Sequence, residues 1–442
     1  MDKDLEAAIT GNRFGLGAVP GSKNGATTKA ALLAEITIPW SPDGVMPPTA
    51  SLVKQGRAGM AAAKGKTGDE KQVMRKAQRQ ARREVLVREL DYRTKLALAP
   101  AGSFRERLVW FWSNHFTVSA QGKPLVEMIV GAFEREAIRA NLHGSFSDLL
   151  LAVTRHPAMQ LYLDNAVSVG PNSTIGKRRQ KGLNENLARE ILELHTLGVG
   201  SGYTQEDVIA LASMLTGWGI SREGAFQFRK AAHEPGAQTL LGATYAASDE
   251  RQAEAALQDI AKRPETAKFI ATKLALAMHS DDPPKSLIDR LETTFITSGG
   301  SLPALHMALI EAPEMWHPNP VKFKTPQEFI ISMMRMTGTE LPPRRGMLKV
   351  LKSLNHMPFY APSPAGWSSV GKDWASPSAI KQRLIISTNF AKGGARQIDP
   401  AALAELAIGP FLSADTRFIL NGASSAEQGL VLLLMCPEFQ RR

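Results

Sequence analysis

The stretch from residue 184 to residue 218 has the most distinct pattern of polar and apolar positions in the chain. On a helix with about 3.6 residues per turn, its first half divides into an apolar side and a polar side. The polar side collects Glu185, Asn186, Arg189, Glu190, Glu193 and Thr196. Gly198 can adopt the left-handed conformation that ends a helix, and Thr204 and Asp207 have the spacing of a capping box. The pattern predicts two helices joined by a glycine-rich turn.

Helical periodicity also dominates the rest of the chain. The pattern predicts helices over about 26–35, 69–98, 104–116, 124–140, 145–154 and 321–338, and two helices each in 248–279 and 285–312. The segment after Trp218 alternates instead, and Pro235 and Gly236 divide it, so the strings FQFR and QTLLG predict the strands of a small β-hairpin. We therefore expect a mainly α fold, a single compact domain over residues 1–442 with a minor β-hairpin and long ordered loops.

Three stretches without helical periodicity are expected to be loops. Residues 54–70 are polar, small and spaced by glycines, which predicts a mobile loop. Residues 166–183 predict a loop that ends in a basic run of Lys177, Arg178, Arg179 and Lys181. Residues 357–377 are rich in proline, glycine, serine and tryptophan. Because long ordered loops with tryptophans commonly line a cleft, Trp367 and Trp374 are candidates to line a ligand site, with packing in the core as an equal alternative.

A short motif occurs three times, in residues 153–159, 309–315 and 433–439. Each copy has apolar residues, then a proline, then a methionine or phenylalanine two positions later. Because proline cannot continue a helix, the motif predicts a helix end packed under a corner. The spacing between the copies is unequal, which argues against a solenoid.

The net charge is +11, and residues 71–93 hold eight basic against three acidic side chains. A helix of this kind can lie against phosphate groups or against an acidic lipid surface. Its acidic neighbours, and the lack of aromatic residues between the basic ones, favour an ordinary solvated face. Nucleic-acid binding through residues 71–93 is therefore the weaker alternative.

The remaining composition narrows the class of protein. Cys436 is the one cysteine, which excludes an intramolecular disulfide and a cysteine-based metal site. No window reaches about 18 apolar residues, so we expect no membrane span. The first residues lack the pattern of an export signal. Cytoplasm is therefore the default location.

The polar side of the first helix in 184–218 carries the best candidates for chemistry. Glu190 and Glu193 lie one turn apart, so they can chelate a cation or share a proton. The alternative is a ladder of surface ion pairs among Glu185, Arg189 and Glu193. His195 projects from the apolar side of the same helix, and we expect a core histidine there.

Other polar groups join this set. His115 ends a helix that is apolar on all sides, where a polar group needs the backbone, another side chain or a ligand as its partner. The candidate catalytic residues are His115, Asp164, Asn184, Asn186, Arg189, Glu190, Glu193 and His233. A divalent cation such as Mg, Mn or Zn, held by Glu190, Glu193 and His115, is an open alternative. Tyr203, in the glycine turn, is a third candidate to line a ligand site.

Six strings together resemble a known family signature: NENLAREILELHTLGVGSGYTQEDV with LTGW, NRFGLGAVPG, FRERLVWFWSNHFTVS, HPAMQLYLDN, HEPG and LLLMCPEFQRR. They are similar to the bacterial family of domain of unknown function 1800, and the resemblance spans the whole chain. It implies that His233 and Glu234 stand where the family has a histidine and an aspartate. It also implies a partner, a phosphatase-like or sulfatase-like protein that is commonly encoded beside members and bears an export signal. No established activity comes with the resemblance.

Three hypotheses about function follow. The first is a scaffold or binding partner of the phosphatase/sulfatase-like neighbour, in which case export as a passenger with that partner is an alternative to the cytoplasm. The second is a metal-dependent or carboxylate-dependent hydrolase or transferase built on the catalytic candidates. The third is nucleic-acid binding through residues 71–93. Whether the protein is an enzyme stays open.

Overall fold

Most of the chain forms α-helices, because apolar residues recur at helical spacing and turn residues separate the runs. The computed structural model describes residues 1–19, 28–39, 46–179, 182–339, 346–394 and 398–442. Within these ranges the strands form two antiparallel sheets of two strands each. The predicted mainly α fold is confirmed.

The helices and strands follow one another along the chain in three groups. Up to residue 155 they are α1 (Lys3–Ile9), α2 (Lys29–Thr37), α3 (Thr49–Ala62), α4 (Gly68–Leu98), α5 (Ser103–His115), α6 (Pro124–Phe133) and α7 (Phe146–Arg155). The middle group is α8 (Pro157–Tyr162), α9 (Thr174–Arg179), α10 (Asn186–Glu190), α11 (Gln205–Leu215), β1 (Trp218–Ile220), β2 (Phe226–Phe228), β3 (Gln238–Leu240), β4 (Ala243–Tyr245), α12 (Arg251–Ala261), α13 (Pro264–Met278), α14 (Lys285–Thr297) and α15 (Leu302–Glu311). The last group is α16 (Pro326–Thr337), α17 (Gly346–Ser353), α18 (Pro377–Gly394), α19 (Pro400–Ile408), α20 (Ala414–Asn421), α21 (Ala426–Met435) and α22 (Pro437–Gln440).

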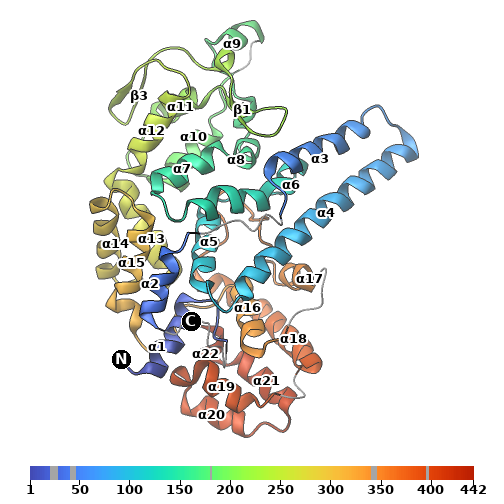
Figure 1. The fold of residues 1–442 in the computed structure, drawn as a ribbon, viewed down its shortest axis with the longest axis vertical. Coiled ribbons are helices and arrows are strands. Elements are labelled where there is room, and N and C mark those ends of the chain that lie inside the picture. Colours follow the sequence, from blue (N-terminus) through green and yellow to red (C-terminus); the bar gives the residue numbers. More distant parts are fainter. Residues whose placement is uncertain (20–27, 40–45, 180–181, 340–345, 395–397) are drawn as a thin grey trace.

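Short turns of 3-10 or π-helix extend several of these elements. The ones that matter below are η2 (Glu134–Ile138), η5 (Ile191–His195), η7 (Pro313–Trp316) and η8 (Gly371–Trp374). In Figure 1 the elements from α7 to α12 and the small sheets lie at one end of an elongated body, and α18 to α21 lie at the other, with α5 between them.

A helical hairpin projects from this body (Figure 1). It consists of α3 and the first half of α4, and we call residues 49–84 the arm. Its base is fixed because Leu52 and Val53 of α3 are buried, as are Val85 and Leu86 just beyond the arm. No residue between 54 and 84, a stretch that is described throughout, is buried. The arm therefore adds little to the core.

The predicted loop at residues 54–70 is largely wrong. Residues 54–62 belong to α3, and α4 begins at Gly68. The glycines suggested a loop, but Gly56 has a packing role, since a Cβ there would lie 2.8 Å from Leu125 Cδ1 of α6. The run of alanines after it favours a helix. In the predicted basic loop of residues 166–183 the structure likewise has a helix, α9; Gln180 and Lys181 lie outside the described residues.

The three proline motifs form the predicted corners. Pro157, Pro313 and Pro437 each stand at the first position of a helix or turn, directly after the end of α7, α15 and α21. The residue before each proline is extended, with ψ of 135° at His156, 121° at Ala312 and 151° at Cys436. Proline disfavours the helical conformation in the residue before it, which explains why each helix ends there.

The strand pairing differs from the predicted hairpin. The FQF strand, β2, pairs with β1, and Trp218 lies opposite Phe228. The QTL strand, β3, pairs with β4 through a tight turn in which Leu241 has φ of +52° and Gly242 has φ of +81°. Two residues with positive φ suit a two-residue hairpin turn. The segment with Pro235 therefore joins two hairpins instead of closing one.

Buried ion pairs connect segments that are far apart in the sequence. Arg107 of α5 contacts Glu328 of α16, and the same carboxylate lies 2.9 Å from Nε of Arg442. Arg93 Nη1 of α4 lies 2.7 Å from Glu134 Oε2 of η2. Further buried pairs join Arg139 to Glu106 and Arg135 to Glu89. The interior is therefore crossed by paired charges as well as packed by apolar side chains.

Candidate functional site

The helix that carries the predicted carboxylates is formed by α10 and η5. It ends at His195, and Gly198 follows in the left-handed conformation with φ of +91°. Thr204 and Asp207 make the capping box that begins α11, since each side chain bonds the backbone N–H of the other. The predicted order of helix, glycine turn and helix is confirmed.

Arg189 occupies the polar side of this helix. Its guanidinium donates to Glu185 Oε2 over 3.1 Å and to Glu193 Oε1 over 3.4 Å. It also donates to Gln205 Oε1 of α11 over 2.8 Å. Of the two alternatives for this face, the ion-pair ladder is therefore present, and it joins α10 to α11 at the surface.

Glu190 is the unpaired member of the carboxylate pair. Among the described residues its carboxylate has no hydrogen-bond or ion-pair partner. Partial burial, together with the charge of Glu193, raises the pKa of Glu190. Burial and the nearby charge of Glu190 raise the pKa of the Tyr162 phenol to about 12. Glu190 is thus a half-buried carboxylate beside a phenol, and it holds a proton more readily than a solvated glutamate does.

Asp164 and Asn184 brace the start of this helix, and Asn186, its first residue, takes part through its backbone amide. Lys123 Nζ donates to Asp164 Oδ1 over 2.7 Å. Asn184 Nδ2 donates to the Asp164 carbonyl oxygen over 3.4 Å, and Asn184 Oδ1 accepts from the Asn186 amide over 2.9 Å. The structure brings these three candidates together, but as a set of bonds that fixes loop conformation.

His115, the last residue of α5, packs against the buried side of the helix formed by α10 and η5. Its Nε2 donates to the His195 carbonyl oxygen over 3.0 Å, and the two rings are 2% and 1% exposed. Burial, reinforced by the charge of Lys273, holds the pKa of His115 well below its usual value and that of His195 at about 3. Both imidazoles are therefore neutral at pH 7. His195 is the core histidine that its position predicted.

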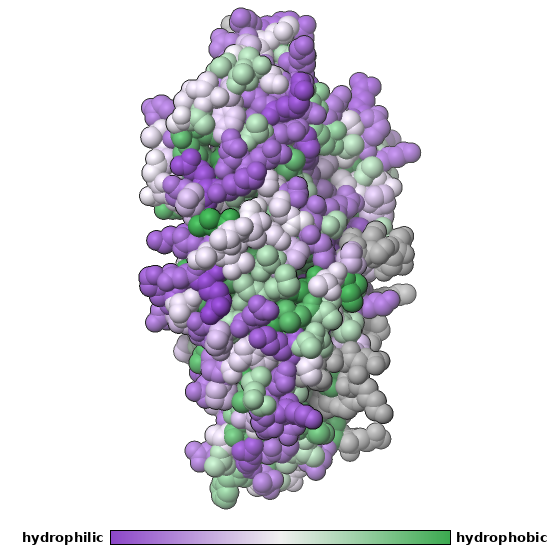
Figure 2. All heavy atoms as spheres, turned by 60° about the vertical axis from the view of Figure 1, so that its left-hand side comes forward, coloured by the Kyte–Doolittle hydropathy of each residue, from purple (hydrophilic) through white to green (hydrophobic). Residues whose placement is uncertain are grey.

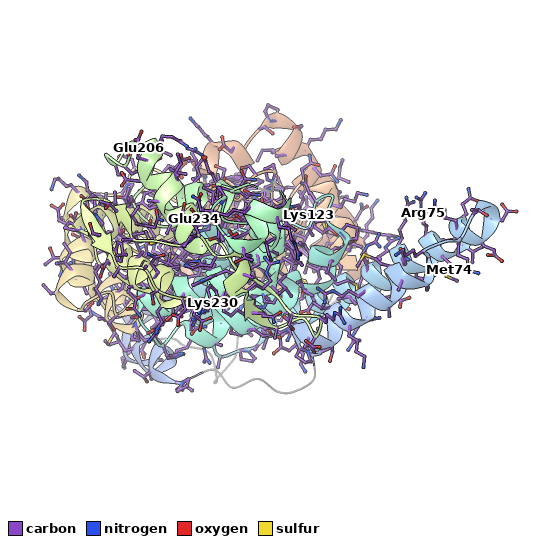
Figure 3. The ribbon with its side chains drawn as sticks, turned by 90° about the horizontal axis from the view of Figure 1, so that it is seen from above. Met74, Arg75, Lys123, Glu206, Lys230 and Glu234 are labelled. Carbon is purple, nitrogen blue, oxygen red and sulfur yellow. The ribbon has the colours of Figure 1, made fainter. Side chains whose placement is uncertain are left out.

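His233 and Glu234 form a separate cluster at the end of α11. His233 Nδ1 donates to the Thr216 carbonyl oxygen over 2.9 Å. The Glu234 carboxylate accepts from the Asn172 amide over 2.9 Å and from Asn172 Nδ2 over 2.6 Å. A Cβ at Gly170 would lie 2.5 Å from Glu234 Oε2, so only glycine fits there. The pair fastens the 170–173 turn to the end of α11, and Figure 3 shows Glu234 apart from Lys123.

The candidate metal ligands do not converge. Glu193 is part-exposed and bound to Arg189, whereas His115 is buried behind the helix backbone. In the part of the chain that the structure describes, no group of three or more His, Cys, Asp or Glu side chains is placed to hold a metal ion. The predicted set of Glu190, Glu193 and His115 is therefore not assembled as one site.

Residues 357–377, which we call the tryptophan loop, contribute one tryptophan to the core and one to a cavity. The rings of Trp367 and Trp374 both pack on His356, with centroids 5.0 Å away in each case. Trp374 is buried, and its Nε1 donates to the Ser368 carbonyl oxygen over 3.0 Å. Tyr203 stays at the surface, where burial, and then a hydrogen bond to Glu193, raise its pKa.

Trp367 lines a cavity of about 140 Å³ between α5, the tryptophan loop and the start of α16. Asn114 joins two of these walls, since its Nδ2 donates to the Trp367 carbonyl oxygen over 2.9 Å and its Oδ1 accepts from the Trp367 amide over 2.8 Å. Other lining residues are Arg93, Arg107, Lys322 and Arg442. No local pattern marks these cations as neighbours, because they come from four remote segments.

The cations of this cavity bind the protein itself. Lys322 Nζ donates to the Leu276 carbonyl oxygen and to Asp281 Oδ1, each over 2.7 Å. Arg442 donates to the carbonyl oxygens of Met278 over 3.0 Å and of Ala277 over 2.6 Å. Lys322 and Arg442 therefore use these hydrogen-bond donors to connect the walls of the cavity.

The whole-chain comparison decides the family. A family model described as "Protein of unknown function (DUF1800)" matches residues 10–441. The chain belongs to this family. No curated protein and no solved structure matches the chain. No helix that the structure describes in this DUF1800 member has both the length and the apolar character needed to cross a membrane.

A second hollow lies on the arm of the DUF1800 chain. It measures about 240 Å³ and runs between α3 and α4 down to the start of α6. We call it the arm groove; its lining residues are Gln55, Gly56, Gly59, Met60, Ala62, Met74, Ala77, Gln78, Ala81, Arg82, Pro124, Leu125 and Met128. Met74, Ala77 and Ala81 recur at helical spacing on α4 and form an apolar stripe in this lining. In Figure 3 Met74 and Arg75 lie on the part that projects farthest from the body.

Proposed function

We propose that the protein is a scaffold or binding partner that holds a second protein by its arm. What carries the proposal is the arm's combination of charge and exposure. The arm holds ten Lys or Arg and three Asp or Glu residues, a net charge of +7 within a chain whose net charge is +11. No residue from 54 to 84 is buried, so this charge has no part in packing the core.

The clustering of positive charge on the arm destabilises its helices, so it needs an explanation. Like charges along one helix face repel each other and weaken the helix. Lys71, Arg75 and Arg79 lie at successive four-residue intervals on α4, and none has a hydrogen-bond or ion-pair partner among the described residues. A surface that carries this repulsion is stabilised when an acidic partner neutralises it. Binding is therefore a better explanation of the arm than folding.

The face of the body that carries α14 and α15 is less distinctive than the arm. In Figure 2, on the side that carries α14 and α15, hydrophobic residues lie in small patches between hydrophilic ones. Such scattered residues are ordinary for a protein surface. The arm, in contrast, joins a projecting shape, a high positive charge and an apolar hollow.

The finer identity of the partner follows from the family resemblance. We propose that this partner is the phosphatase-like or sulfatase-like neighbour protein. On this proposal the chain is exported as a passenger with that partner. The test is co-purification of the two full-length proteins at native expression. Replacing Lys71, Arg75 and Arg79 by glutamate should abolish the complex, because it turns an attractive face into a repulsive one.

A matched control comes from the opposite side of the body. Lys262, Lys268 and Arg290 are exposed on α12 to α14 and have no side-chain partner among the described residues. Replacing these three by glutamate makes the same change in net charge and should leave the complex intact. Equal loss in both variants would mean that overall charge, and not the arm, decides binding. A complex that survives the arm variant would refute the proposal.

One observation favours a second candidate, an acid and base catalyst centred on Glu190. Its half-buried carboxylate has no partner among the described residues, and its pKa is raised. Partial burial and a neighbouring carboxylate are the features by which enzymes raise the pKa of a carboxyl group that acts as a general acid or base. The test is a panel of ester and phosphate substrates with wild type and Glu190→Gln. Turnover by wild type that Glu190→Gln loses would support this candidate, and absence of turnover in both would remove it.

A further inference from the structure

We propose that the arm groove binds an acidic amphipathic helix of the partner protein. In this complex the apolar side of the helix enters the groove, and its carboxylates pair with Lys71 and Arg75. The inference rests on the proposed function and adds to it the place of contact and the chemistry of the partner.

The floor of the groove suits the apolar side of a helix. Two glycines and three alanines line it, and at Gly59 there is room for a side chain, whereas Gly56 is packed against Leu125. Met60 and Met74 supply the larger apolar surface, since Met60 is 44% exposed and Met74 is half-buried, whereas Met128 is only 2% exposed at the base of the groove. Methionine is flexible and polarisable, and it commonly adapts to apolar side chains at helix-binding surfaces.

One edge of the groove provides the matching charge. On a helix with about 100° per residue, Lys71 and Arg75 lie along one flank of the α4 lining of the groove, whereas Arg79 points about 160° away from Ala77 and Ala81. Successive cations are about 6 Å apart along the axis, because each residue rises about 1.5 Å. Glutamates at four-residue intervals on a second helix have the same spacing. Charge and periodicity therefore complement each other.

Not every cation near the groove is free to take part. Arg82 lines the groove, but its Nε donates to Glu127 Oε2 of α6 over 2.7 Å. Arg57 of α3 donates to the carbonyl oxygens of Ser221 over 2.9 Å and of Arg222 over 2.7 Å. These two arginines hold the arm's base to the body. The free cations are farther out, where a partner can reach them.

The shape and composition of the arm favour a protein helix over a membrane or a nucleic acid. Helices that lie on membranes place large apolar side chains, such as Trp, Phe and Leu, on a convex face. Here the apolar surface is concave, and Met60 and Val73 are the strongly exposed large apolar residues of the arm. Residues 49–84 contain no aromatic side chain on which a base could stack.

The test uses a fluorescent peptide and the full-length protein. The peptide has about 18 residues, with leucines at helical spacing on one side and glutamates at four-residue intervals beside them. A second peptide has the same composition in scrambled order. Fluorescence anisotropy measures the dissociation constant of each. We expect the patterned peptide to bind at least about tenfold more tightly than the scrambled one, a difference of about 1.4 kcal/mol.

Two matched variants locate the binding. Gly59→Leu fills the groove, and α3 tolerates it because a Cβ at Gly59 meets only Gln78 Cγ at 3.5 Å, an ordinary contact. Ala61→Leu places the same leucine side chain at an exposed position of the same helix outside the groove lining. We expect Gly59→Leu to weaken peptide binding at least about tenfold and Ala61→Leu to change it less than about twofold.

The outcomes that overturn the inference are separate from those that overturn the proposed function. No binding of the patterned peptide, equal binding of the scrambled peptide, or full binding by Gly59→Leu each refutes the groove. Displacement of the peptide by vesicles of phosphatidylserine or by a short DNA duplex, at lower concentration than the unlabelled peptide needs, would assign the arm to a lipid surface or a nucleic acid. If Gly59→Leu keeps the full-length partner while the Lys71, Arg75 and Arg79 variant loses it, the arm binds the partner without the groove.

Discussion

Arginine has opposite roles in the body of the protein and in the arm. In the body, Arg107 and Arg442 are buried, and they share the Glu328 carboxylate while their other donors bind backbone carbonyls. In the arm, Arg75 and Arg79 are exposed and have no partner among the described residues. The cost of removing a charge from water explains the difference, since a buried cation needs a partner within the protein and an exposed one does not. Arginines in buried ion pairs therefore stabilise the fold, and exposed arginines without a partner are available for binding.

The largest effect is expected from breaking the charge cluster of the body. Glu328→Gln leaves Arg107 and Arg442 buried without their carboxylate, which should lower the free energy of unfolding by about 3–5 kcal/mol. Urea denaturation at pH 7 measures it. Glu405→Gln is the control, because it breaks an exposed pair with Arg417 and should cost less than about 1 kcal/mol. Equal effects would contradict the distinction between buried and exposed arginines.

The next largest effect is a loss of folding stability at low pH, caused by buried histidines in the body. Burial holds the pKa of His195 and of His306 at about 3, against 6.5 for a solvated histidine. Between these values the unfolded chain binds more protons than the folded one, so stability falls as the pH is lowered from 6.5 towards 3.

The size of this effect is about 1.4 kcal/mol per pH unit for each such histidine. Urea denaturation at pH 7.0, 6.0 and 5.0 measures the slope. His306→Gln removes one of the titrating rings and should reduce the slope by about that amount. A slope that stays unchanged in His306→Gln would show that this ring is not buried as the structure has it.

A smaller effect on stability is expected from the arm. The glutamate variant of Lys71, Arg75 and Arg79 should change the free energy of unfolding by less than about 0.5 kcal/mol, because exposed residues without partners add little to the fold. The same variant should lose the partner protein. A large loss of stability would mean that the arm belongs to the folded core, and the contrast between the two regions would fail.

The smallest effect on stability is expected at Glu190, which is neither fully buried like Arg107 nor exposed like Arg75. Its folded-state pKa is raised above 4.5, so its favourable contribution is complete below pH 4.5 and is lost as the pH rises through the folded value. Glu190→Gln should therefore be slightly more stable than wild type at pH 7, by less than about 0.5 kcal/mol for a half-exposed group. Thermal unfolding at pH 7 and pH 4 checks that the difference vanishes in acid.

Local signals in the sequence predicted much of the fold. The Thr204 and Asp207 capping box, and the three proline corners, depend on residues a few positions apart, and the structure has them as predicted. The predictions that were wrong concern the 54–70 segment and the strand pairing, where local sequence signals were not enough. The glycine at position 56 suits close packing against Leu125, which is distant in the sequence, and the β3–β4 turn contains Leu241 with a positive φ, which is uncommon outside glycine.

The candidate site was predictable to a similar degree. The spacing of Glu185, Arg189 and Glu193 left two alternatives, and Arg189 bonds both carboxylates. The role of His115 depends on the carbonyl of His195, which is 80 residues away in sequence. The charged cavity depends on four remote segments. Long-range partners of this kind leave no local pattern, so only the folded chain reveals them.

Hydrogen exchange of the full-length protein, alone and with its co-purified partner, most directly tests the division between body and arm. We expect the partner to slow amide exchange in residues 54–84 and to leave exchange around Arg107 and Glu328 unchanged, since binding protects a surface that folding does not use. A complex that forms without slower exchange in residues 54–84 would contradict the central claim that the arm is the binding element of this protein.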